Sequence, residues 1–108
     1  MSKLQIAIES QDAPQAAAAL LKIEGISGNY EVPNQKEGTL ATIATIVGIV
    51  GGTVALAEQI RKWYQEWKEK QPNKVFDVII VNPDTGSRIF LEEATIEEIT
   101  DILKSLSQ

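Results

Sequence analysis

The residues that most resemble a catalytic motif are Asp84, Thr85 and Gly86, which follow a run of apolar residues. Aspartic proteases of the dimeric retroviral type carry such a triplet in chains of about this length. Their chemistry needs two carboxylates held close together on free loops of a nearly all-β fold. Here Asn82-Pro83 precedes the triplet, a composition that favours a tight turn between two strands. We therefore interpret the triplet as part of a β-hairpin.

Residue types that most often perform catalysis are missing from the chain. It contains no cysteine and no histidine, which excludes disulfides, thiolate nucleophiles, imidazole bases and the usual ligands of zinc, copper and haem. An acidic group near the C-terminus lacks the spacing and turn glycine of a calcium-binding loop, and compensates a helix dipole instead. Its members are Glu92, Glu93, Glu97, Glu98 and Asp101. We predict no catalytic residue, no metal ligand, no cofactor and hence no enzyme.

Charge and the first residues limit the partners and the location of the protein. Ten basic and 15 acidic residues give a net charge of −5, the wrong sign for a phosphate-binding surface. We therefore expect no nucleic-acid partner. Residues Met1 to Ile6 contain no apolar segment that would direct secretion, so we expect a cytoplasmic protein.

Three glycines, Gly48, Gly51 and Gly52, lie close together in an apolar segment, as in some nucleotide-binding loops. Their spacing matches neither common phosphate-binding motif, and no lysine follows to meet a phosphate. We interpret them, with Ala55, as small residues that allow another backbone to approach a helix closely. Gly48 and Gly52 also form a G-x-x-x-G pair. A role in helix packing is therefore predicted for these four residues.

One cluster of aromatic residues, Trp63, Tyr64 and Trp67, is surrounded by basic residues. Trp63 and Trp67 lie on one face of a helix at this spacing, and we expect them to complete the core. Tyr64 is open to either the core or an interface. Tyrosine and arginine are enriched at binding hot spots. We therefore predict a partner interface made of Arg61, Lys62, Tyr64 and Lys68.

The pattern of apolar residues predicts the elements that would hold these groups. The expected strands are residues 4–8, a short one around Tyr30 and Val32, 75–81 and 88–91, and the expected helices are 14–24, 39–71 and one beginning at the capping box Thr95–Glu98. The order is β-α-β-α-β-β-α. At 108 residues we expect one α+β domain, residues 1–108. Its mixed sheet of about four strands should pack on a long apolar helix and two shorter helices.

The long helix is the least ordinary of these elements. An unbroken helix from Thr39 to Gln71 would be about 50 Å long, which exceeds a domain of this size. It must bend near Gly51-Gly52 or project onto another surface. Apolar residues on every side of its first half predict complete burial, and the run Val75–Val81 predicts a strand buried on both faces.

Residues Thr39–Ala57 include no charged residue, and this length could cross a bilayer. A single crossing would separate the first strand from the hairpin at residues 75–91 and leave too few strands on each side for stability. We therefore favour burial of this segment within the protein. Membrane association, with insertion or oligomerisation through Gly48 and Gly52, is the alternative.

Taken together, the chain resembles the bacterial family called effector-associated constant component. The resemblance rests on the strand Leu4–Ile8, the helix before Gly25, the Gly- and Ala-rich segment Thr39–Ala57 leading into Arg61-Lys-Trp63, and the hairpin Val78–Gly86 before a last helix. It covers nearly the whole chain and concerns architecture, because no functional residues of the family can be carried over. It implies an accessory protein that acts with an effector, such as one with a trypsin-like or caspase-like peptidase domain.

From these observations we expect a non-catalytic protein-protein interaction module. It would act as an adaptor or regulatory subunit with an effector in a bacterial signalling or defence system. A homo-oligomer is also an expected form, because the acidic C-terminal segment could pair with the basic Arg61–Lys74 segment of a second copy.

Overall fold

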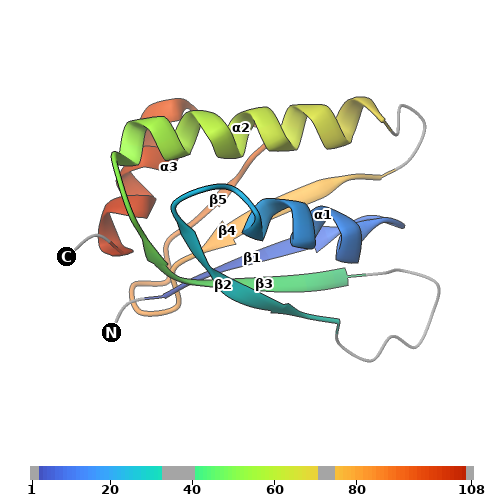
Figure 1. Cartoon of the computed structure of the whole chain (residues 1–108), viewed down its shortest axis with the longest axis horizontal. Coiled ribbons are helices and arrows are strands. Elements are labelled where there is room, and N and C mark those ends of the chain that lie inside the picture. The colour runs from blue at the N-terminus through green and yellow to red at the C-terminus, as the bar shows by residue number, and fades with distance from the viewer. Residues whose placement is uncertain (1–2, 33–40, 71–74, 107–108) are drawn as a thin grey trace.

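The first strand follows from its alternating apolar residues, because Leu4, Ile6 and Ile8 are completely buried and the residues between them are not. The computed structural model describes residues 3–32, 41–70 and 75–106 (Figure 1). Its elements are β1 (Leu4–Glu9), α1 (Ala13–Leu21), β2 (Ile26–Glu31), β3 (Ala41–Ile49), α2 (Thr53–Glu69), β4 (Asp77–Val81), β5 (Arg88–Phe90), α3 (Ile96–Leu103) and the 3₁₀-helix η1 (Lys104–Leu106).

The strands form one sheet of five in the order β2-β3-β1-β4-β5, with every neighbouring pair antiparallel. Because β3 lies between β1 and β2, those two strands run in the same direction. The first four strands with α1 and α2 therefore have the split β-α-β order called ferredoxin-like, to which β5 and α3 are added. The predicted α+β class is confirmed. The sheet has one strand more than the predicted four and is not mixed.

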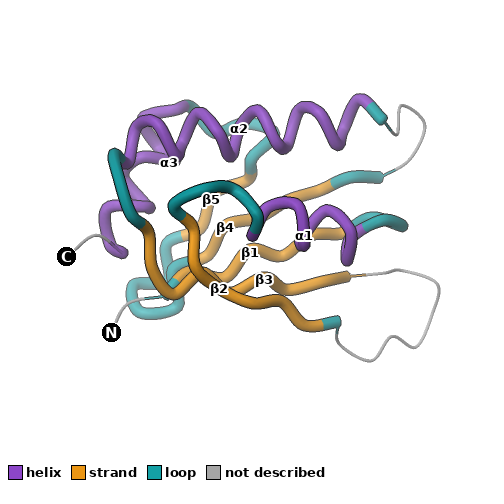
Figure 2. The backbone as a smooth tube through the Cα atoms, in the orientation of Figure 1, coloured by secondary structure: helices purple, strands orange, loops and turns teal. Residues whose placement is uncertain are grey.

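The predicted long apolar helix is wrong, because the segment forms a strand followed by a helix. β3 ends at Ile49, and the chain turns at Gly51, whose φ of 102° suits glycine, before α2 begins after Gly52 (Figure 2). The isoleucines, threonines and valines of this segment are β-branched and favour a strand. Residues 39, 40 and 71, at the ends of the predicted helix, lie outside the described residues.

The membrane alternative depended on that helix. Among the residues that the structure describes, no helix combines the length and the apolar character needed to cross a bilayer. Burial of Thr39–Ala57 was also predicted too broadly. Thr42, Ala44 and Ile46 of β3 are completely buried, whereas Ile43 and Thr45 are only partly buried and Val47 is exposed. One face of the strand is therefore in the core and the other is not.

The three helices cover one face of the sheet and close a single hydrophobic core with it (Figure 1). Trp63 is buried between the helices, where its Nε1 donates a hydrogen bond of 2.9 Å to the carbonyl of Ala16 in α1. The rings of Trp63 and Tyr64 also pack against Phe76, with centroids 5.9 and 5.6 Å away. Trp67 packs on the edge of this core. The core positions predicted for both tryptophans are confirmed.

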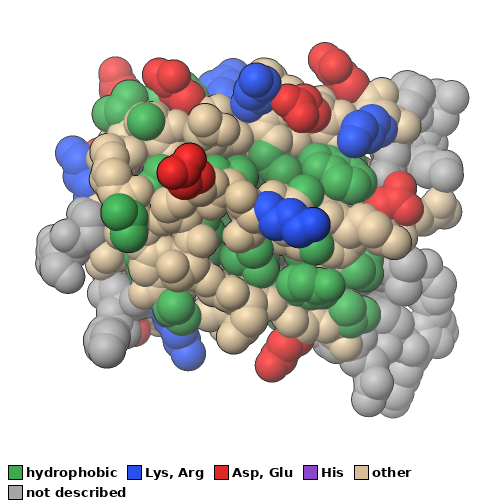
Figure 3. Space-filling view, viewed as in Figure 1, with side chains coloured by type: hydrophobic (Ala, Val, Ile, Leu, Met, Phe, Trp, Pro, Cys, Tyr) green, Lys and Arg blue, Asp and Glu red, His purple; other side chains and the backbone are tan. Residues whose placement is uncertain are grey.

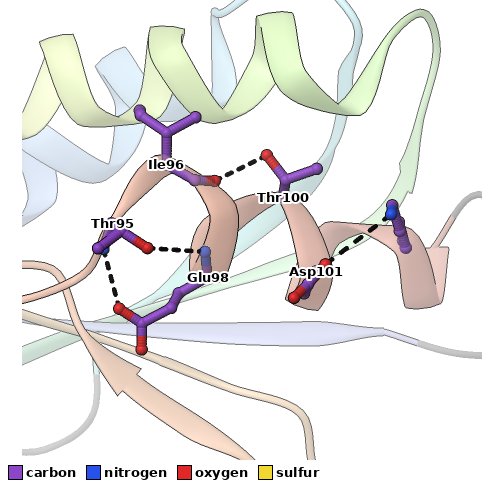
Figure 4. Close-up of polar contacts among 6 residues, drawn as sticks. Thr95, Ile96, Glu98, Thr100 and Asp101 are labelled. Atoms are coloured by element: carbon purple, nitrogen blue, oxygen red, sulfur yellow. Dashed lines mark hydrogen bonds and ion pairs between the residues drawn. The ribbon is translucent and has the colours of Figure 1, made fainter.

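The last helix begins at the predicted capping box (Figure 4). The Thr95 hydroxyl accepts a hydrogen bond of 3.1 Å from the Glu98 amide, and the Glu98 carboxylate accepts one of 3.0 Å from the Thr95 amide. Both interactions satisfy amide groups that a helix start leaves without a partner. α3 then packs along α2, with Ile99 and Leu103 completely buried.

Candidate interaction surface

The Asp84-Thr85-Gly86 triplet forms the turn between β4 and β5, as predicted. The Asn82 side chain accepts a hydrogen bond of 2.9 Å from the Asp84 amide, and the Asn82 carbonyl accepts one of 2.8 Å from the Gly86 amide. Gly86 has a φ of 78°, which suits glycine. Asp84 is exposed at the tip of this hairpin. Its carboxylate therefore belongs to an exposed turn.

Neither the acidic residues nor the lysines of the described segments form a chemically unusual group. Within residues 3–32, 41–70 and 75–106, no group of three or more carboxylates is arranged to hold a metal ion. The pKa of Lys68 is raised, first by the Tyr64 hydroxyl, which lies 3.4 Å from its Nζ, and further by the Glu92 carboxylate. Lys68 therefore stays protonated at neutral pH and acts as a cation.

Three of the four residues predicted to form a partner interface make contacts within the chain. Arg61 Nη1 donates a hydrogen bond of 3.1 Å to the Ala94 carbonyl, and Lys68 Nζ lies 3.7 Å from a carboxylate oxygen of Glu92. Both contacts join α2 to the segment before α3. The ring of Tyr64 is only 5% exposed, so it cannot contribute much to an interface. Lys62 is exposed, and among the described residues it has no such hydrogen bond or ion pair.

The Lys68–Glu92 pair also bears on the predicted homo-oligomer. It joins, within one chain, the basic and acidic segments that we expected to pair between two copies. Acidic and basic side chains are mixed along the outer side of the helices (Figure 3). The part of that side seen in this view therefore carries both signs of charge.

The helix-packing role predicted for Gly48, Gly51, Gly52 and Ala55 is wrong. Gly48 lies in β3, Gly51 and Gly52 form the turn after it, and Ala55 is exposed in the first turn of α2. A Cβ atom added to any of the three glycines would meet nothing within 4 Å. No described atom lies where a side chain at these positions would point, because the segment is not the continuous helix that the prediction assumed.

A glycine outside that set does hold two segments close together. Gly25, with a φ of 97°, accepts a hydrogen bond of 2.7 Å from the Val50 amide. A Cβ atom at Gly25 would lie 2.6 Å from the Val50 carbonyl oxygen. An open hollow of about 570 Å³ lies beside this contact, between the start of α2 and the start of β2. Glu24 contributes a carboxylate to its lining, which disfavours an anionic ligand at the N-terminus of α2.

The face of the sheet opposite the helices carries a row of apolar side chains. Cross-strand pairing places Phe90, Ile79, Ala7 and Ile43 in line across β5, β4, β1 and β3. Each alternates with residues of the core and so points away from it. Phe90 is 51% exposed, and the other three are partly exposed. We call this row the apolar strip, and the sheet surface around it the open face.

Two rows of polar side chains border the apolar strip. Glu9 of β1 and Asp77 of β4 are direct cross-strand neighbours on one side, and we call this pair the acidic row. The row on the other side consists, in order across the strands, of Arg88, Val81, Gln5 and Thr45. All but Val81 can donate hydrogen bonds, and we call this set the donor row. Like charges placed directly opposite each other destabilise a sheet. Among the described residues, neither carboxylate of the acidic row forms an ion pair.

Sequence reasoning did not identify the open face, because its residues come from four strands and meet only through their register. One signal was present in the sequence. Apolar side chains occupy both alternations of β3 and β4, as in Ile43 beside Ala44 and Ile79 beside Ile80. A strand in a sheet covered on one side needs only one such alternation.

Together the fold and the open face define a two-layer α+β protein in which described helices cover one side of the sheet. Comparisons with protein-family profiles, with characterised proteins and with solved structures find no match. The resemblance to effector-associated constant component therefore stays a prediction.

Proposed function

We propose that this chain is a non-catalytic protein-binding module that assembles through its open face. It serves as an adaptor or regulatory subunit beside an effector in a bacterial signalling or defence system, and it works in the cytoplasm. The single observation that carries this proposal is the apolar strip, which lies in register on the side of the sheet opposite the described helices.

The chemistry of the open face supports a protein as its ligand. Burying apolar surface contributes about 25 cal/mol for each Å² removed from water, so an exposed row with an aromatic side chain favours association. The acidic and donor rows on either side add charges and hydrogen-bonding groups that select an orientation. An apolar centre with a polar rim is the usual composition of a protein interface.

The effector part of the proposal rests on the resemblance, which implies an accessory protein beside a peptidase-type effector. Lys62 and its neighbours on the outer side of α2 remain the predicted contact for that effector. Such an arrangement would use the two sides of the molecule for two different contacts, the open face for assembly and the helical side for the effector.

The test is an affinity purification from the native host with three forms of the protein. We expect the wild type and Val54→Glu to recover the same effector, identified by mass spectrometry. Val54 is 53% exposed in the first turn of α2, where it lies beside α3, away from the strip and on another side of α2 from Lys62. Phe90→Glu places a charge on the strip and prevents assembly. It should recover at least tenfold less effector, because we expect only the assembled form to hold the effector tightly. Recovery of the bait alone by the wild type under all conditions would contradict the adaptor role.

A further inference from the structure

We infer that the open face binds the open face of a second copy, in a two-fold dimer whose axis lies along the apolar strip. This inference rests on the proposed function of that face as an assembly surface. In such a dimer, Phe90, Ile79, Ala7 and Ile43 of each copy pack against the same residues of the other. An interface of this kind is isologous, because each copy contributes the same patch.

The charges on the two sides of the strip decide the direction of the axis. A two-fold axis parallel to the strands would place the acidic row of one copy on the acidic row of the other. An axis along the strip exchanges the two rows, so that each acidic row faces the partner's donor row. Glu9 then faces Gln5 of the second copy. Both residues belong to β1 and lie two positions from Ala7, on opposite sides of the axis.

Arg88 completes the charge complementarity. It pairs in register with Val81 at the donor end of β4, whereas Asp77 lies at the acidic end of the same strand. Exchange of the two rows brings Arg88 of one copy over β5 of the other copy. β5 is the strand next to β4, which carries Asp77. The side-chain amide of Gln5 and the guanidinium of Arg88 from the second copy therefore approach the Glu9–Asp77 pair, which forms no ion pair among the described residues of its own chain. Glu31 pairs with Ile43 at the far end of the strip, so the Glu31 carboxylates of the two copies would face each other across the axis. Both lie on the exposed rim, where solvent and salt screen their repulsion.

The size of the open face predicts a weak dimer. Five strands about 4.8 Å apart, each contributing about five residues at about 3.3 Å, cover roughly 400 Å² in each copy, or on the order of 800–1,000 Å² in the dimer. This area lies near the lower limit for specific interfaces, which suggests a dissociation constant on the order of micromolar. The dimer should therefore form and dissociate within an accessible range of protein concentration.

Sedimentation equilibrium of the purified protein over that range provides the first test. The wild type should change from the mass of one chain, 11.8 kDa, to twice that mass as the concentration rises. Phe90→Glu should weaken the association at least tenfold, whereas Val54→Glu should leave it unchanged. A wild type that stays monomeric at about millimolar concentration, or a Phe90→Glu protein that associates equally well, would overturn the inference.

A charge exchange tests the orientation itself. Asp77→Arg places two guanidinium groups together and Arg88→Asp places two carboxylates together, so each variant alone should weaken the dimer about tenfold or more. The double variant restores one charge of each sign and should recover most of the wild-type affinity. If the double variant is instead weaker than both single variants, the axis does not lie along the strip. Circular dichroism of each variant confirms that the monomer is folded.

Failure of this inference and failure of the proposed function give different results. If the protein is monomeric at every concentration but Phe90→Glu still loses the effector, the open face binds the effector directly and the dimer is wrong. If the dimer forms but no effector is recovered, the dimer stands and the adaptor role is wrong.

Discussion

Among the described residues, the hydroxyl of Thr42 is a buried polar group without a hydrogen-bond partner. Its side chain is completely buried in β3, and its oxygen has no hydrogen-bond partner in the described part of the chain. A buried hydroxyl without a partner costs more than an apolar group of the same shape. We expect Thr42→Val to raise the free energy of unfolding in urea by about 1 kcal/mol. Thr45→Val, on the partly exposed side of the same strand, should change it by less than about 0.5 kcal/mol.

Gly25 and Gly48 predict opposite results for the same substitution. At Gly25 an alanine would have a positive φ and a Cβ atom 2.6 Å from the Val50 carbonyl oxygen. We expect Gly25→Ala to lower the free energy of unfolding by about 2–3 kcal/mol, as positions with a strained backbone do. Gly48→Ala meets nothing within 4 Å and should be neutral or slightly stabilising. Equal losses in thermal or urea unfolding would contradict this assignment and would restore a packing role for Gly48.

At the scale of elements, Trp63 joins the two helices of the ferredoxin-like unit. Its indole fills the space between α1, α2 and Phe76, and donates to the Ala16 carbonyl. Trp63→Phe removes both the hydrogen bond and part of the packed ring, so unfolding should become easier by about 2–3 kcal/mol. Trp67→Phe is the matched control, because that ring packs only at the edge of the core. Urea unfolding followed by far-UV circular dichroism measures both, and a larger loss for Trp67→Phe would contradict the assignment.

Local signals predicted some elements well and failed for one. The alternation at Leu4, Ile6 and Ile8 identified β1, the turn residues Asn82–Gly86 identified the hairpin, and Thr95 with Glu98 identified the start of α3. Each of these signals is complete within a few residues. The segment at 41–49 has apolar residues in both alternations, a pattern shared by buried helices and strands. Its β-branched residues were the better guide, and Gly51 marked the boundary.

The open face belongs to the scale of the whole molecule, and for that reason the sequence could not specify it. Ile43 and Ile79 are 36 positions apart in the numbering but become neighbours of Ala7 through the registers of β1 with β3 and β4. A shift of one residue in either register would turn those side chains toward the core. The predicted interface on α2 instead relied on residue types alone. Three of its four residues proved to hold α2 to neighbouring segments of the same chain.

Hydrogen exchange can distinguish packing of copies face to face from pairing at the sheet edges. β1 has a paired strand on both sides, so its amides should exchange only when the whole protein unfolds, whereas β5 is a three-residue edge strand and should exchange much faster. Contact between open faces leaves both edges unpaired. Raising the protein concentration should therefore leave the exchange of the edge strands β2 and β5 unchanged relative to β1. Selective protection of either edge at high concentration would show that copies extend the sheet, because only strand addition supplies partners for edge amides.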